Sequence, residues 1–179
     1  IEGYASLLQD PTLSATEHKE YTEMIIHSTR RLNSLSTNIL SLSKLENQKI
    51  ALENKLYGLD EQIRQAVLML EPEWHLKNLD LQIELIKAEY FGNENLLMQV
   101  WLNLISNAIK FTPDSGTIKI SLYEEDDYLI FNITDTGIGI EDSIIDNIFD
   151  KFFQEDSTRK TEGYGLGLAL VKGILDLSK

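Results

Sequence analysis

Apolar residues recur along the first part of the chain at helical spacing. Residues 1–9 read as the end of one helix, which stops at Asp10 and the proline that follows it. A second helix is expected from a cap at Ser14 or Thr16, with glutamates in its first turn, to about Asn47. The beginning of the chain is therefore predicted to be a helical hairpin.

The second helix carries a narrow apolar seam. Its members are separated by seven, three, four and three positions: Ile25, Leu32, Leu35, Ile39 and Leu42. This is the a/d spacing of a helix packed in a bundle or coiled coil. We therefore expect residues 1–48 to associate with a second copy of the chain into a four-helix bundle. The alternative is a helix that lies on the domain that follows it.

From residue 49 the pattern changes to a mixed α/β one. The predicted strands are 55–59, 79–86, 117–123 and 128–133. The predicted helices are one capped by Asp60 that stops near Pro72, a strong one over 93–111, a short one over 144–149, and a final one from about Gly165. The last two strands are joined across an acidic tip at 124–127. The expected fold class is α+β, with residues 49–179 as the second domain.

Composition narrows the function classes. The chain has 29 acidic and 16 basic residues and a net charge of −13, which repels nucleic acid and anionic lipid, so neither is expected as a partner. The absence of cysteine excludes disulfides, thiolate catalysis and cysteine zinc sites. No apolar run is long enough to span a bilayer, and the start of the chain is no signal peptide. A polyanionic ligand would need a local group of hydrogen-bond donors.

The helix over 93–111 has a polar stripe opposite its apolar face, formed by Gln99, Asn103, Asn107 and Lys110. An ordinary solvated face is one interpretation. Solvated faces favour Glu and Lys, however, and Asn is a poor helix former. We therefore infer that Asn103 and Asn107 serve through their amides, and an amide oxygen is a suitable ligand for magnesium that phosphate already binds.

Two glycine segments follow. In the first, Asp135 ends a strand and precedes Gly137 and Gly139, where the backbone can turn tightly and a flat ligand can approach. The Asp135 carboxylate could accept a hydrogen bond from an amine such as that of adenine, although an ordinary turn is the alternative. The second segment, 163–168, opens the final helix and can present backbone N–H groups to phosphate. Its spacing matches neither a dinucleotide fingerprint nor a P-loop.

The order of these motifs resembles the GHKL family of ATPases and kinases. Residues 99–113 look like the N-box of sensor histidine kinases, and 135–139, 149–153 and 163–168 are similar to their G1, F and G2 boxes. Residues 1–8 resemble the stretch that follows the phospho-acceptor histidine in the same kinases. The resemblance therefore covers nearly the whole chain.

The resemblance implies a two-layer α/β sandwich, the Bergerat fold, that binds ATP and Mg²⁺. Asn107 would ligate the metal, while Asn103 and Lys110 would act in catalysis by contacting phosphates or metal. The nucleotide-binding set it implies is Asn103, Asn107, Lys110, Phe111, Asp135, Gly137, Ile138, Gly139, Lys151, Gly163, Gly165, Leu166, Gly167 and Leu168. Residues 150–162 would form a mobile lid.

The implied activity is transfer of the γ-phosphoryl group of Mg-ATP to a histidine, followed by relay to an aspartate in the receiver domain of a response regulator. The implied assembly is a homodimer held by the hairpin. A hydrolytic GHKL ATPase, like DNA gyrase B, MutL or the heat-shock chaperones, is the alternative, but those enzymes carry Glu where this chain has Asn103. A scaffold without activity is a third reading.

The chain departs from the family pattern at both ends. The acceptor histidine is expected upstream of Ile1, because His18, His27 and His75 stand in the wrong contexts. The family also continues beyond the position of Lys179 into a glycine turn and two strands. We therefore expect a cytoplasmic piece that does not phosphorylate itself, and membrane anchoring of the parent protein only through segments upstream.

Overall fold

In a computed structural model of the chain, the described residues are 1–46, 53–154 and 164–178. The chain divides into two compact units, Ile1–Ser43 and Lys44–Lys179. The domain boundary expected between residues 48 and 49 lies outside the described residues.

The first unit is the expected hairpin, made of α1 (Glu2–Leu7) and the long α2 (Ala15–Glu46). Ser14 is the cap: its Oγ accepts a hydrogen bond from Glu17 N at 3.2 Å, and the Glu17 carboxylate accepts one from Ser14 N at 2.8 Å. This reciprocal capping box explains why Ser14, and not Thr16, is the cap of the helix. The rings of Tyr4 and Tyr21, 5.9 Å apart, join the two helices.

The second unit contains two sheets. Strand β1 (Lys55–Gly58) pairs antiparallel with β3 (Glu89–Gly92), while β2 (Asp80–Leu85) pairs parallel with β4 (Thr117–Glu125), which pairs antiparallel with β5 (Tyr128–Asp135). The four predicted strands are confirmed, and β3 was not predicted. Asp126 and Asp127 form the turn between β4 and β5 with φ of 48° and 65°. Two residues of positive φ suit the right-handed twist of a tight hairpin.

The helical segments among the described residues of this unit are α3 (Leu59–Met69), α4 (Glu71–Leu76), α5 (Glu94–Phe111), the 3₁₀ turn η1 (Asp142–Asn147) and α6 (Gly167–Leu177). The expectation that Asp60 caps α3 is wrong, because Gly58 holds that position. Asp60 instead pairs with Arg64 and accepts a hydrogen bond from Ala88 N. Pro72 does end α3, but it also starts α4, where its missing N–H costs nothing. The helix expected over 144–149 is the 3₁₀ turn, shifted toward the N-terminus.

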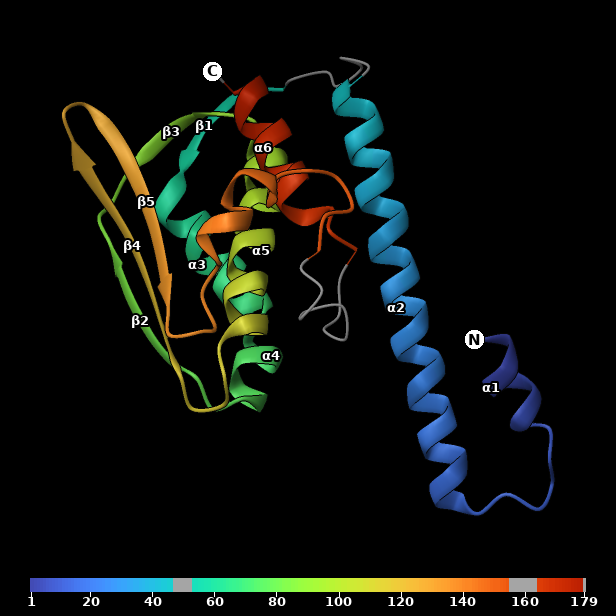
Figure 1. The fold of residues 1–179 in the computed structure, drawn as a ribbon. Coiled ribbons are helices and arrows are strands. Elements are labelled where there is room, and N and C mark those ends of the chain that lie inside the picture. The colour runs from blue at the N-terminus through green and yellow to red at the C-terminus, as the bar shows by residue number, and fades with distance from the viewer. Residues whose placement is uncertain (47–52, 155–163, 179) are drawn as a thin grey trace. The chain divides into compact units, whose positions relative to one another are not determined.

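The two-layer α/β arrangement is confirmed. Helices α3, α5 and α6 cover one side of the sheets, and the other side is open (Figure 1). Strand β4 shows why: Ile118, Ile120 and Leu122 are at most 1% exposed, whereas Lys119 and Tyr123 between and beside them are exposed. This alternation is that of a sheet buried on one face only.

Helix α5 is anchored near its start by the buried side chain of Gln62. The Trp101 indole N–H donates to Gln62 Oε1 at 2.9 Å, and Gln62 Nε2 donates to the Glu94 carbonyl at 2.7 Å. Trp101 also packs on the Phe131 ring of β5 at 4.6 Å between centroids. An unpaired buried polar group costs about 1–3 kcal/mol, so this satisfied bridge ties α5 to α3 in one register.

Candidate functional site

The polar stripe of α5 is half-buried along its length. Asn103 Nδ2 donates to the Gln99 carbonyl at 2.8 Å, one turn earlier, which orients the amide and leaves Oδ1 as an acceptor. The Gln99 side-chain oxygen is itself buried, without a hydrogen-bond partner in the part of the chain that is described. At the far end, the Lys110 ammonium lies 4.4 Å from the centre of the Phe111 ring. Asn103, Asn107 and Lys110 therefore share one partly accessible face.

The G1 turn after β5 lies directly on the end of α5. A Cβ at Gly137 would be 2.7 Å from the Phe111 carbonyl oxygen and 2.5 Å from Asp135 Oδ1, so no other residue fits without displacement. The Gly137 N–H donates to Asp135 Oδ1 at 2.8 Å, which closes the turn. The structure thus brings Phe111, Asp135 and Gly137 together.

The rest of the G1 loop is open. Gly139 has a φ of 72° and no heavy atom within 4 Å of the position its Cβ would take. Ile138 is 68% exposed. These two residues line the surface beside the turn and do not contribute to the core.

The F-box backbone supports Gly165 in the G2 segment. Gly165 has a φ of 66°, and a Cβ there would collide with the Phe153 carbonyl oxygen. The Phe152 N–H donates to the Gly165 carbonyl at 2.8 Å. Lys151 is exposed next to this contact. The F-box and the G2 segment, which are separate in the sequence, therefore meet backbone to backbone.

Helix α6 begins beside Asn103. A Cβ at Gly167 would lie 2.7 Å from Asn103 Oδ1, so a larger residue there would require the Asn103 amide to move. Its N-cap, Leu166, is buried and makes no side-chain hydrogen bond to the first amides, while Leu168 is half-buried. The first N–H groups of a helix carry partial positive charge and suit an anion. This local arrangement provides the donors that a chain of charge −13 needs for a polyanionic ligand.

Two family models match the chain in succession. The His Kinase A (phospho-acceptor) domain matches residues 1–48, and the histidine kinase-, DNA gyrase B- and HSP90-like ATPase matches residues 92–179. The chain is 35% identical to the autoinducer 2 sensor kinase/phosphatase LuxQ of Vibrio parahaemolyticus, over 99% of this chain and 22% of that protein. It is 34% identical to the circadian input-output histidine kinase CikA of Thermosynechococcus vestitus, over 97% of this chain and 25% of that protein.

The chain belongs to the sensor histidine kinase family. A solved structure of full-length ShkA in complex with AMPPNP resembles it with a TM-score of 0.74 and 27% identity, over 96% of this chain and 36% of that one. The Acinetobacter baumannii histidine kinase AdeS, at 23% identity and a TM-score of 0.74 over 98% of this chain and 81% of that one, supports the fold. The chain spans about a quarter of the length of its curated relatives.

Gly163 and residues 155–162 of the expected lid lie outside the described residues. Within the described ranges, no group of three or more His, Asp or Glu side chains is arranged to hold a metal ion. No helix in those ranges is long and apolar enough to cross a membrane.

Sequence reasoning missed one residue at the site, Lys77. Its ammonium donates to the carbonyls of Ile109, Lys110 and Thr112 at 2.8 to 2.9 Å and so closes the end of α5. These partners lie 32 to 35 positions away in the chain. A lysine just after a short helix gives no periodic signal, and only the tertiary fold shows the contact.

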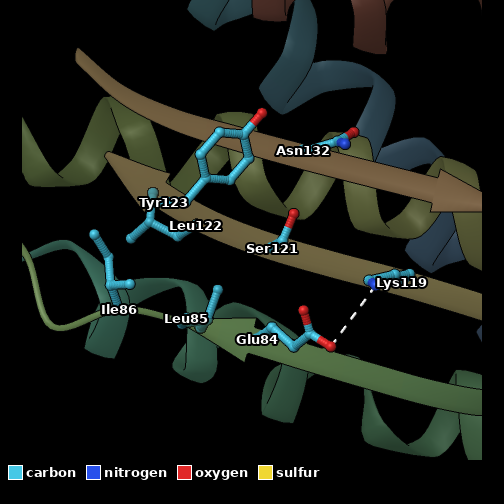
Figure 2. A pocket seen from close by; sticks show the side chains of 8 residues that line it. All are labelled: Glu84, Leu85, Ile86, Lys119, Ser121, Leu122, Tyr123 and Asn132. Atoms are coloured by element: carbon cyan, nitrogen blue, oxygen red, sulfur yellow. Dashed lines mark ion pairs between the residues drawn. The ribbon is translucent and has the colours of Figure 1, made fainter. Parts of the chain in front are cut away.

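A shallow depression on the open face of the sheet is a separate feature. Figure 2 shows its lining, which comes from β2, β4 and β5 and includes the Lys119–Glu84 ion pair at 3.7 Å. None of the residues predicted for the nucleotide site lines it. The contacts among the glycine segments and α5, and not this depression, therefore define the candidate site.

Two glycines of positive φ make a matched test of this geometry. Gly165→Ala should lower the free energy of unfolding by about 3 kcal/mol, because the new methyl meets the F-box backbone. Gly139→Ala should cost only about 1 kcal/mol, because it carries the left-handed backbone penalty without a collision. Urea unfolding of both variants measures the difference. Equal losses would show that the G2 segment does not rest on the F-box.

Proposed function

We propose that this chain is the catalytic region of a kinase that binds Mg-ATP between α5 and α6 and transfers the γ-phosphoryl group to a histidine. The observation that carries the proposal is the contact of Gly167 with Asn103. It brings the N-terminus of α6, which has no side-chain cap, beside the Asn103 amide, and there the first N–H groups of α6 could donate to phosphate. Membership of the histidine kinase family supports the same assignment.

The residues present fit a nucleotide. Of the two carboxylate oxygens of Asp135, Oδ1 accepts from the Gly137 N–H, and we assign Oδ2 to the adenine amine. The close approach of Gly137 to α5 and the open surface at Gly139 leave room for a flat ring beside the turn. The α6 amides at Gly167 and Leu168 would donate to phosphate oxygens.

Magnesium fits the amide face of α5. The Asn107 oxygen is a neutral, hard ligand, and the other ligands of the metal would be phosphate oxygens and water. Bound magnesium would neutralise phosphate charge during transfer. Lys110, at the end of the same stripe, and Asn103 would orient the phosphates, so that catalysis rests on positioning and charge neutralisation.

The choice between kinase and hydrolase depends on Asn103. A hydrolytic relative would use a carboxylate at this position to orient and deprotonate water. The Asn103 amide cannot take a proton, and its Nδ2 is already bonded to the Gln99 carbonyl. We therefore assign phosphoryl transfer to a protein histidine, with relay to an aspartate of a response regulator receiver domain.

Magnesium-dependent ATP binding should be weakened by one substitution in α5 and unchanged by a control substitution in the same helix. Asn107→Ala removes the metal ligand and should weaken Mg-ATP binding by about tenfold or more. Asn95→Ala, at an exposed position in the first turn of the same helix, should bind as the parent does. Calorimetric titration with and without magnesium measures both. If Asn107→Ala binds Mg-ATP like the parent, the metal assignment is wrong.

Transfer of label from γ-labelled ATP separates kinase from hydrolase. The 179-residue chain should bind ATP but neither label itself nor release phosphate rapidly, whereas a chain extended upstream to include the acceptor histidine should become labelled. The bond should break in acid and survive base, as a phosphoramidate does. Rapid phosphate release from the 179-residue chain would favour the hydrolase instead.

Dimerisation should depend on the seam of α2. Leu32 and Ile39 of the seam are 56% and 44% exposed in the single chain, as a face awaiting a partner would be. In the upstream-extended chain, Leu35→Glu would bury a charge in the bundle and weaken the dimer by several kcal/mol, roughly the cost of an unpaired buried charge. Ser36→Glu, at the adjacent exposed position, is the control. Light scattering that shows the unsubstituted extended chain to be monomeric would exclude the bundle.

A further inference from the structure

Lys77 lies outside every sequence motif, yet its side chain holds the end of the N-box helix. It follows α4 directly, and Asn78 after it has a φ of 50°, which turns the chain sharply toward β2. From there the Lys77 ammonium donates to the carbonyls of Ile109 at 2.8 Å, Lys110 at 2.9 Å and Thr112 at 2.8 Å. An ammonium has three N–H donors, and here all three are used.

This contact satisfies the part of α5 that a helix cannot satisfy alone. The last carbonyls of a helix have no partner within it and together carry partial negative charge, which a cation stabilises. Lys77 also acts through its backbone, since its carbonyl accepts a hydrogen bond from Ser115 N at 2.8 Å. Side chain and backbone together therefore hold the segment that joins α5 to β4.

The same helix end supports the G1 turn. Among the carbonyls of residues 109–112, those of 109, 110 and 112 accept from Lys77, and that of Phe111 lies against Gly137. On the other side of the turn, the Thr136 hydroxyl accepts a hydrogen bond from Thr117 N at 3.0 Å. The hydrogen bonds from Lys77 to the neighbouring carbonyls thus fix the direction of the Phe111 carbonyl. That direction in turn determines the position of Gly137, which packs against it.

We propose that Lys77 is a positioning residue for nucleotide binding: its ammonium sets the end of α5 so that Lys110, Phe111 and the G1 turn take the geometry the nucleotide needs. The inference rests on the proposed ATP-binding function of the same site. Lys77 acts through the helix carbonyls and not by touching the nucleotide. A positive charge with hydrogen-bond donors at this position should therefore matter more than the volume that the side chain fills.

The lack of cysteine in the chain permits a direct test of charge against volume. The Lys77→Cys variant is alkylated in denaturant and then refolded. Alkylation with 2-bromoethylamine restores an ammonium at lysine length, whereas alkylation with iodoacetamide adds a neutral amide. Lys87→Cys, at an exposed position between β2 and β3, receives the same treatments as the control. Binding of AMPPNP with magnesium is measured by calorimetry, and hydrogen exchange is measured at the Gly137 and Ile120 amides.

The neutral form at position 77 should bind AMPPNP about tenfold more weakly than the parent, a size expected for loss of a partly buried charge at a helix C-terminus. The aminoethylated form should regain parental affinity, and all forms of the Lys87 variant should bind alike. The Gly137 amide should exchange faster in the neutral form, while the Ile120 amide in the middle of β4 should keep its protection. A merely structural role would expose both amides together.

Equal AMPPNP affinity of the neutral and aminoethylated forms would overturn the inference, whether both bind like the parent or both bind more weakly. If Lys77→Cys does not refold, Lys77→Arg and Lys77→Gln make the same comparison, because Arg keeps the cation and Gln does not. Equal affinities in that pair overturn the inference too. Failure of the unsubstituted chain to bind AMPPNP would instead refute the proposed function, and the two failures are therefore distinguishable.

Discussion

Close contact between glycine backbones and other chain segments is the constraint on which the candidate site depends. Gly137 lies on the Phe111 carbonyl, Gly165 on the F-box backbone, and Gly167 on the Asn103 side chain. At Gly137 and Gly165 a single methyl group would overlap backbone atoms, and at Gly167 it would displace the Asn103 side-chain amide. Segments far apart in sequence therefore meet around α5 because glycine leaves the space for them.

Helix α5 can organise these segments because both of its ends are held by polar contacts. At the start, the Asn93 side chain accepts from Leu96 N, and Gln62 bridges Glu94 and Trp101. At the C-terminal end, the Lys77 ammonium donates hydrogen bonds to three carbonyls. Between the ends, one face packs in the core and the other carries the amides. The start of α6 then supplies partial positive charge where the net charge of the chain would oppose an anion.

Sequence patterns predicted the elements with strong periodicity and missed those defined by tertiary contact. The long apolar face of α5 and the alternation of β4 identify both elements, and the glycine motifs indicate the site. Strand β3, Glu-Tyr-Phe-Gly, shows no alternation of apolar and polar residues, because its apolar Phe91 is exposed and its buried position is Gly92. Asp60 resembled a cap by its position before an apolar run, but its carboxylate bonds Arg64 and Ala88. The motifs named Gly167 and Asn103 separately, and only the fold shows that they touch.

The parallel pairing of β2 with β4 has a consequence for how the molecule can open. Parallel neighbours need a crossover connection, and here that connection runs from Leu85, the last residue of β2, to Thr117, the first residue of β4, and contains β3 and α5. Asp80 N also donates to the Gly116 carbonyl, where the crossover returns to the sheet. The binding helix is thus a link in a closed loop of chain and not an appendage to it. Loss of the ladder would free both ends of the crossover that carries α5, so we expect the sheet and the helix at the candidate site to open as one cooperative unit.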